Sequence, residues 1–114
     1  MLTMLGIPNC DTIRKAKAYL EKNNVPFTFR DLRKQPLDPS AWRDLAEADG
    51  ENKLVNTRGP AFRKLGVDKN ALDVDTKVAV LTQQPAAMKR PVMLRDGQLQ
   101  TIGFSEESFQ RFLQ

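Results

Sequence analysis

The sequence contains no histidine and only one cysteine, Cys10, among its 114 residues. Without histidine, the chain lacks the usual general base, the usual activating partner of a nucleophilic cysteine and the commonest nitrogen ligand of metals. With one cysteine it can form no internal disulfide, which is typical of proteins in a reducing compartment and predicts a cytoplasmic location. A reactive Cys10 would have to be activated by a helix dipole, by backbone N–H groups or by a nearby cation.

Long apolar runs are also missing. No stretch approaches the ~20 apolar residues of a membrane-spanning helix, and the first residues lack the features of a secretory signal. Lys and Arg outnumber Asp and Glu by 18 to 14, but the basic residues are scattered along the chain. There is no Cys/His cluster and no Gly-rich phosphate loop. We therefore expect no metal, no membrane association and no nucleic acid as the main ligand. We also expect a monomer.

The N-terminal part of the sequence predicts a βαβ unit. Leu2 to Leu5 is a short apolar strand, and a helical spacing of apolar residues begins at Asp11 and ends at Asn23-Asn24. Residues 25–32 then alternate between apolar and polar side chains and predict a second strand. Because a helix of about a dozen residues joins them, the two strands should be parallel.

The remainder of the sequence predicts a helical middle followed by a ββα unit. The middle elements are a helix from Asp38-Pro39 to Gly50, a helical turn at Ala61 to Leu65 and a helix from about Asp75 to Gln83. The last elements are strands at 88–95 and 98–102, joined at Asp96-Gly97, and a helix capped by Ser105. This order predicts an α/β, thioredoxin-like fold (βαβ + ββα, mixed four-stranded sheet). We expect one domain over residues 1–114, with a helical insertion between the halves at about 36–86.

Cys10 lies in the segment Gly6-Ile7-Pro8-Asn9-Cys10-Asp11-Thr12, where the first strand turns into the first helix. A lone cysteine is more often a small buried apolar side chain than a nucleophile. Here the polar neighbours and the helix N-terminus favour a thiolate, because free N–H groups and the positive end of the helix dipole stabilise it. Ile13 stands where a second cysteine would be, so a redox cycle needs an external thiol such as glutathione.

Arginines in two other segments are candidate substrate ligands. Arg90-Pro91 is, on its own, consistent with a surface arginine and a turn proline before an edge strand. In a thioredoxin layout, however, the proline that opens the third strand is typically cis and faces the cysteine, so Arg90 would hold an anion or carboxylate beside the sulfur. Arg58, in Asn56-Thr57-Arg58-Gly59, is either a second substrate cation or a residue of an ordinary turn.

Three segments, Gly6 to Thr12, Leu54 to Gly59 and Met88 to Val92, resemble the arsenate reductase-like (ArsC/Spx/YffB) family, and most closely its YffB-like branch. The resemblance covers essentially the whole chain and implies a thioredoxin-like fold with a helical insertion. In the family's arsenate reductases, the cysteine matching Cys10 attacks arsenate and is resolved by glutathione through glutaredoxin, while three arginines surround the oxyanion.

The sequence departs from that family pattern at the arginines. Only Arg90 matches cleanly; Asn56 stands at the second position, with Arg58 displaced by two residues, and the third position, near Gly103 or Phe104, has no arginine. Since one charge-assisted contact contributes roughly 1.5–3 kcal/mol, this loss disfavours arsenate as the substrate. The Cys-x-x-Cys with which the family's Spx-like regulators sense redox state is also absent.

These observations predict an oxidoreductase, a glutathione-dependent thiol–disulfide reductase that is glutaredoxin-like and works by a monothiol mechanism. The expected partners are glutathione, as a co-substrate rather than a bound cofactor, and a protein or small-molecule disulfide. One alternative is a glutathione/glutaredoxin-coupled arsenate reductase, and another is a non-catalytic, Spx-like protein-binding regulator. The predicted site consists of the catalytic Cys10 and of substrate-binding Arg90, Pro91, Arg58, Asn9, Asp11 and Thr12.

Overall fold

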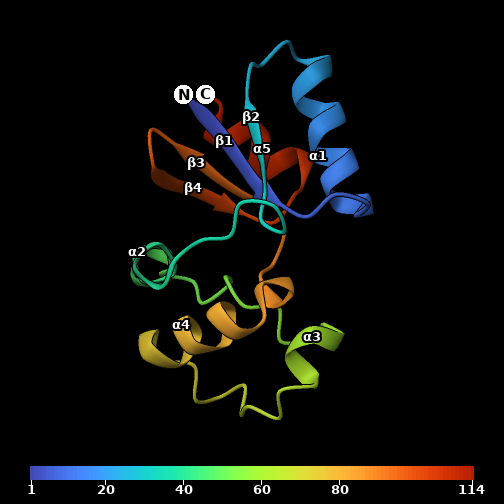
Figure 1. Cartoon of the computed structure of the whole chain (residues 1–114). Coiled ribbons are helices and arrows are strands. Elements are labelled where there is room, and N and C mark those ends of the chain that lie inside the picture. Colours follow the sequence, from blue (N-terminus) through green and yellow to red (C-terminus); the bar gives the residue numbers. More distant parts are fainter. The chain divides into compact units, whose positions relative to one another are not determined.

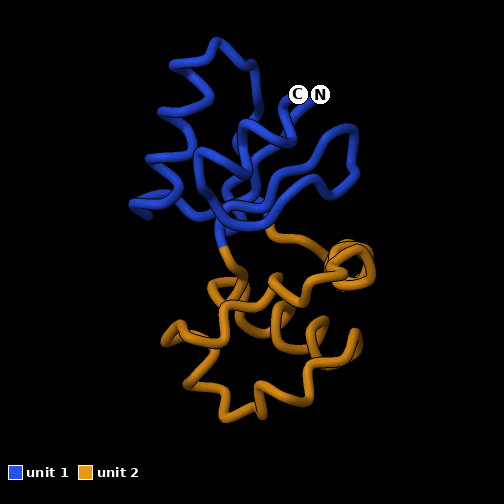
Figure 2. The backbone as a smooth tube through the Cα atoms, turned by 180° about the vertical axis from the view of Figure 1, so that it is seen from behind, with its two compact units in different colours: residues 1–35, 90–114 blue, residues 36–89 orange.

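The computed structural model describes all of residues 1–114, and the chain divides into two compact units (Figure 2). Unit 1 comprises Met1–Gln35 and Arg90–Gln114, and unit 2 comprises Pro36–Lys89. Unit 2 is thus one continuous stretch, inserted in sequence between the two segments of unit 1. None of the helices has the length and apolar character needed to span a bilayer.

Unit 1 is built on a mixed four-stranded sheet with the order β2-β1-β3-β4 (Figure 1). The strands are β1 (Leu2–Gly6), β2 (Thr28–Asp31), β3 (Val92–Arg95) and β4 (Gln98–Ile102). β1 is parallel to β2 and antiparallel to β3, and β3 is antiparallel to β4. The predicted α/β, thioredoxin-like arrangement of a βαβ and a ββα half is therefore confirmed.

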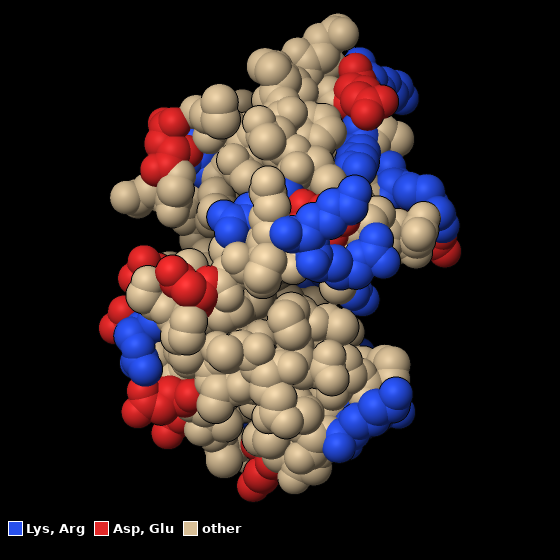
Figure 3. All heavy atoms as spheres, viewed as in Figure 1, with Lys and Arg blue, Asp and Glu red and all other residues tan.

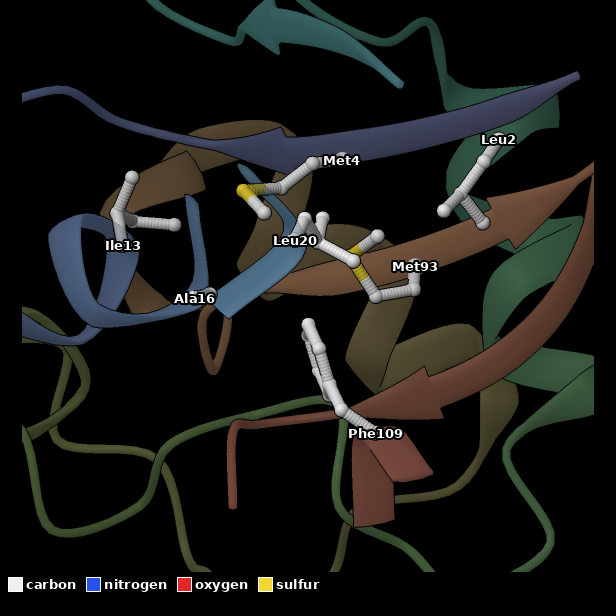
Figure 4. Close-up of a cluster of buried hydrophobic side chains, with 7 residues drawn as sticks. All are labelled: Leu2, Met4, Ile13, Ala16, Leu20, Met93 and Phe109. Atoms are coloured by element: carbon white, nitrogen blue, oxygen red, sulfur yellow. The ribbon is translucent and has the colours of Figure 1, made fainter. Parts of the chain in front are cut away.

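Helices α1 (Asp11–Lys22) and α5 (Glu106–Phe112) share one buried core with the sheet of unit 1 (Figure 4). Alternation along a strand puts residues two apart on the same face, and helical spacing gathers every third or fourth residue into one stripe. Each large apolar side chain that is fully buried stabilises the fold by about 1.5–3 kcal/mol. The core residues are Leu2 and Met4 of β1, Ile13, Ala16 and Leu20 of α1, Met93 of β3 and Phe109 of α5.

Two strands begin later than the sequence predicts. β2 starts at Thr28 rather than at residue 25, because the Val25 N–H donates to the Leu20 carbonyl at the end of α1 (2.9 Å) and Pro26 has no N–H. β3 starts at Val92 rather than at residue 88, because Met88 forms an isolated bridge with Val55 instead. The predicted strands therefore included flanking residues whose backbones bond elsewhere.

Unit 2 is helical, as the sequence predicts for the middle of the chain. Aspartates cap its two longer helices: the Asp38 carboxylate accepts the Ala41 N–H at 2.9 Å, and the Asp73 carboxylate accepts the Thr76 N–H at 2.8 Å. α2 and α4 pack together and bury apolar side chains that include Trp42. The elements are α2 (Pro39–Ala48), α3 (Pro60–Arg63), α4 (Val74–Gln83) and the 3₁₀ helix η1 (Pro85–Ala87).

A buried ion pair joins α4 to the segment that follows α2. The Lys77 ammonium lies 3.2 Å from the Asp49 carboxylate, and these side chains are only 6% and 1% exposed. The same carboxylate accepts the backbone N–H groups of Lys53 at 2.8 Å and Leu54 at 2.9 Å. Asp49 therefore fixes the segment whose Leu54 carbonyl accepts the Lys89 N–H at 2.8 Å.

Candidate functional site

Cys10 lies at the junction of β1 and α1, as predicted. It is the N-cap of α1 with an extended backbone (φ −112°, ψ 130°), and its carbonyl accepts the Arg14 N–H at 3.0 Å to close the first helical turn. Asn9, directly before it, has a φ of 65°, which turns the chain into the helix. At Gly6 a Cβ would lie 2.5 Å from Cδ1 of Ile13, so glycine allows the end of β1 and the start of α1 to approach closely.

The surroundings of the Cys10 thiol favour its ionised form. Partial burial raises the pKa of Cys10, but opposing groups outweigh burial and hold the pKa below the ordinary value of a cysteine. These groups are the backbone N–H of Ile13, the backbone N–H of Thr12, the positive charge of Arg90 and the Thr12 side chain, in decreasing order of effect. Cys10 is partly exposed, so the sulfur is also within reach of solvent. A low pKa combined with exposure is the condition of a reactive cysteine.

The thiol makes no capping hydrogen bond of ordinary geometry. The N–H groups of Thr12 and Ile13 therefore act on the sulfur as oriented dipoles at the positive end of α1. Catalytic hydrogen bonds are often long without substrate and shorten when charge develops. A thiolate at Cys10 would draw these two N–H groups closer.

Arg90 and Pro91 lead the chain into β3, and the peptide bond between them is cis, as the thioredoxin layout implies. The carbonyl of the buried Pro91 accepts the Gly103 N–H at 2.8 Å, which fixes the start of β3 against the residue after β4. Arg90 is half-buried and forms no ion pair within the chain. Its guanidinium thus acts on Cys10 without being neutralised by a protein carboxylate.

The remaining predicted site residues are more dispersed. Asn9 and Asp11 are exposed, and the Asp11 carboxylate pairs with Arg14, so their roles in substrate binding stay predictions. Arg58 belongs to unit 2, where its backbone N–H donates to the Asn56 side chain at 3.3 Å. Its predicted role beside Cys10 also stays a prediction. The groups that the structure brings together around the sulfur are those of Thr12, Ile13 and Arg90.

One contributor to the site was missed in the sequence. The side chain of Ile13 is the only part of that residue named in the prediction, as the place of an absent second cysteine, whereas its backbone N–H is the largest of the effects that lower the Cys10 pKa. Once Cys10 is identified as the N-cap, Ile13 is the third residue of the helix, whose N–H points toward the cap position. Counting helix positions from the N-cap would have identified it.

Positive charge is concentrated in the unit that carries Cys10. Unit 1 contains ten Lys and Arg against six Asp and Glu, whereas unit 2 contains eight of each, so the net charge of +4 belongs to unit 1. On the face seen in Figure 3, Lys and Arg atoms gather over α1 and over the turn after β2. Such a field attracts anionic ligands to the unit that holds the thiol.

Comparison with known proteins assigns the family. The family model described as "ArsC family" matches residues 5–112. The global transcriptional regulator Spx 1 of Oceanobacillus iheyensis is 32% identical over 115 residues, which cover 99% of this chain and 87% of that relative. Among solved structures, a protein named YFFB (PA3664) superposes with a TM-score of 0.86 at 27% identity, covering 100% of both chains. A possible arsenate reductase from Streptococcus mutans superposes with a TM-score of 0.80 at 30% identity, covering 96% of this chain and 98% of the other.

These matches span the sheet, Cys10 and the Arg90-Pro91 segment, and they include unit 2 as well as unit 1. The resemblance predicted from the three sequence segments is therefore confirmed over nearly the whole chain. The protein belongs to the ArsC family.

Proposed function

We propose that the protein is a glutathione-dependent thiol–disulfide reductase that works through Cys10 alone. The observation that carries this proposal is the lowered pKa of a partly exposed thiol at the start of α1, beside an arginine that no carboxylate neutralises. The thiolate is the nucleophilic form of cysteine. Because the sequence contains no second cysteine, the sulfur that resolves the intermediate must come from another molecule.

In the first step the Cys10 thiolate attacks one sulfur of a glutathionylated thiol. A new S–S bond forms between Cys10 and the glutathione sulfur, and the former partner leaves as a thiolate that takes a proton from water. The N–H groups of Thr12 and Ile13 would stabilise the attacking thiolate, and Arg90, whose positive charge acts on Cys10, would hold a carboxylate of the glutathione moiety. The backbone of Arg90 makes no hydrogen bond within the chain, which supports pairing with an extended peptide.

In the second step the thiolate of another glutathione attacks the glutathione sulfur of the mixed disulfide. Oxidised glutathione leaves, and Cys10 is released as a thiolate. With an ordinary disulfide as substrate, one further exchange with glutathione precedes this step. The two electrons come from glutathione, so the cycle requires a compartment rich in reduced glutathione. We propose that this compartment is the cytoplasm and that the protein acts there as a monomer.

Treatment with oxidised glutathione followed by intact mass measurement tests the proposal. We expect one added glutathione on the native protein and none on Cys10→Ser. The native protein should also accelerate reduction of a glutathionylated peptide by glutathione, measured as the appearance of oxidised glutathione, and Cys10→Ser should not. If Cys10 has the alkylation profile of a free cysteine and takes up no glutathione, the proposal is wrong.

The family offers a second enzymatic candidate, since a possible arsenate reductase is 30% identical to this chain. The resemblance implies arginines at Asn56 and near Gly103 or Phe104, and this chain has none there. The missing arginines disfavour arsenate reduction. Consumption of glutathione that depends on arsenate and on Cys10 would favour this candidate. An unchanged rate on adding arsenate would leave the disulfide reductase in place.

A regulatory candidate rests on the likeness to the global transcriptional regulator Spx 1, which extends over 99% of this chain. The protein would then bind another protein without catalysis. Ile13 stands where a Cys-x-x-Cys redox sensor would have its second cysteine, so Cys10 cannot form an internal disulfide. This disfavours a redox sensor of the Cys-x-x-Cys type. Specific capture of RNA polymerase by both the native protein and Cys10→Ser, without reductase activity, would favour regulation.

A further inference from the structure

Unit 2 contains a cationic hollow that the proposed reductase chemistry does not require. Its volume is about 530 Å³, and its residues come from the loop before α3, from α3 itself and from the loop after it. It is lined by Thr57, Arg58, Phe62, Arg63, Val67 and Lys69. Three of these six side chains carry a positive charge, and no aspartate or glutamate lines the hollow.

The three cations of the hollow are not neutralised by the protein. Among the five other basic residues of unit 2, Arg43, Lys53 and Lys77 are each held by a carboxylate, at distances of 2.8–3.2 Å. Lys64 and Lys89 form no ion pair, but they lie outside the hollow. Arg58, Arg63 and Lys69 form no ion pair, and all three are exposed. In Figure 3, blue atoms lie over α3, whereas the red atoms of this unit lie over other elements.

The nearest carboxylate in sequence, that of Asp68, forms no ion pair with these cations. The Asp68 side chain accepts the backbone N–H of Asn70 at 2.9 Å and so closes the turn that presents Lys69. Three like charges around one hollow repel one another unless an anion lies between them. The arrangement therefore favours a ligand with more than one negative charge.

The other lining groups narrow the chemistry of that ligand. Guanidinium groups bind phosphate or carboxylate oxygens in bidentate fashion, an ammonium adds a point charge, and the Thr57 hydroxyl can donate to an oxygen. Half-buried Val67 and the edge of Phe62, a side chain that is only 4% exposed, give the hollow a small apolar margin. The volume falls within the ~300–1,000 Å³ of small-molecule sites. We propose that this hollow binds a small molecule with a diphosphate group and a flat apolar part, of which a nucleoside diphosphate is the representative.

The charge distribution of unit 2 favours a small ligand over a nucleic acid. Eight acidic residues balance the eight basic residues of the unit, so unit 2 has no net positive charge to attract a polyanion. Outside the hollow, only Lys64 and Lys89 lack a carboxylate partner. Nucleic-acid binding needs several phosphate contacts spread along a basic surface. Since the chain has no Gly-rich phosphate loop, side chains rather than backbone N–H groups would hold the diphosphate.

The experiment measures binding of ADP, pyrophosphate and inorganic phosphate to the full chain by calorimetry, with backbone NMR shifts to locate the ligand. We expect ADP and pyrophosphate to shift residues 57–69, and ADP to bind more tightly than pyrophosphate, which in turn binds more tightly than phosphate. The double variant Arg63→Gln, Lys69→Gln should weaken ADP binding at least about tenfold, since charge-assisted contacts are lost. Lys64→Gln, Lys89→Gln removes the same charge from exposed residues outside the hollow and should change affinity less than about threefold.

Several results would overturn the proposal. These are no binding of ADP or pyrophosphate at millimolar concentration, equal weakening by both double variants, equal affinity for phosphate and ADP, or tighter binding of a short DNA duplex at the same residues. Thermal unfolding of each variant checks that the fold is intact. Cys10→Ser should bind ADP like the native protein, so failure of the reductase proposal and failure of this one are distinguishable.

Discussion

The buried pair of Asp49 and Lys77 gives a quantitative prediction for Asp49→Ala. The substitution removes the acceptor of three hydrogen bonds, those from Lys77, Lys53 and Leu54, and leaves a nearly buried ammonium without its partner. Breaking a buried ion pair from one side costs about 3–5 kcal/mol, and this range already includes the desolvated N–H groups because such losses are not additive. We expect a loss of about 4 kcal/mol, against a typical total of roughly 5–15 kcal/mol.

A loss of this size should lower the melting temperature by roughly 15 °C for a chain of this length. Trp42 is the only tryptophan, is buried and belongs to unit 2, so its fluorescence reports unfolding of the unit in question. Lys77→Met keeps the apolar stem and leaves Asp49 with its two backbone N–H donors, so the expected loss is about half as large.

Asp44→Ala is the matched control, because Asp44 is an exposed aspartate of the neighbouring helix α2. Its effect should stay within about 0.5 kcal/mol, as for most surface substitutions. If Asp49→Ala melted within roughly 2 °C of the native protein, the hydrogen bonds of Asp49 would not hold unit 2 together as we infer.

Three other predictions concern unit 1. Arg90→Gln should raise the Cys10 pKa, so the pH profile of iodoacetamide alkylation should shift to higher pH. Arg90→Lys keeps the positive charge and should shift the profile less. If the native protein and Arg90→Gln gave the same profile, Arg90 would not act on the thiol. Because the folded-state pKa of Cys10 is lowered, the stability that its thiolate contributes should be complete above the unfolded pKa and be lost as pH falls through the folded pKa. Denaturant unfolding of the native protein and of Cys10→Ser should therefore differ more at pH 9 than at pH 6, and a constant difference would contradict the linkage. Gly6→Ala should destabilise the protein by about 1–3 kcal/mol because its Cβ would overlap Ile13. Gly50→Ala is the control, because its Cβ would meet open space and should not destabilise the protein. Chemical unfolding measures the free energy of unfolding of both variants.

The elements that are set by local chemistry could be predicted from the sequence. Asp38-Pro39 marks the start of α2 because an aspartate cap and a proline at the first helical position are both local signals. Ser105 likewise caps α5, where its hydroxyl accepts the Ser108 N–H at 3.0 Å. The junction at Cys10 followed from a short apolar strand running into a helical pattern. In each case, residues within a few positions of one another determine the outcome.

Features that depend on distant partners could not be predicted in the same way. Asp49 and Lys77 are 28 residues apart, and each by itself has the pattern of an exposed polar residue of a helix end or helix face. Arg90 is 80 positions from Cys10, and its place beside the thiol was expected from the thioredoxin layout and the family resemblance rather than from spacing. The late start of β3 depends on Val55, which lies 33 positions before Met88 in the sequence and forms a bridge with it.

Because the two segments of unit 1 are separated in sequence by unit 2, unit 1 is completed late during synthesis of the chain. A ribosome releases β1, α1 and β2 first, then the whole of unit 2, and only at the end β3, β4 and α5. Until then the core lacks Met93 and Phe109, so α1 has no completed sheet or partner helix to cover, whereas unit 2 already has all its residues. Arg90 also arrives in this last segment. The nascent protein therefore carries Cys10 without its neighbouring cation, and its thiol gains its full acidity only after synthesis is nearly complete.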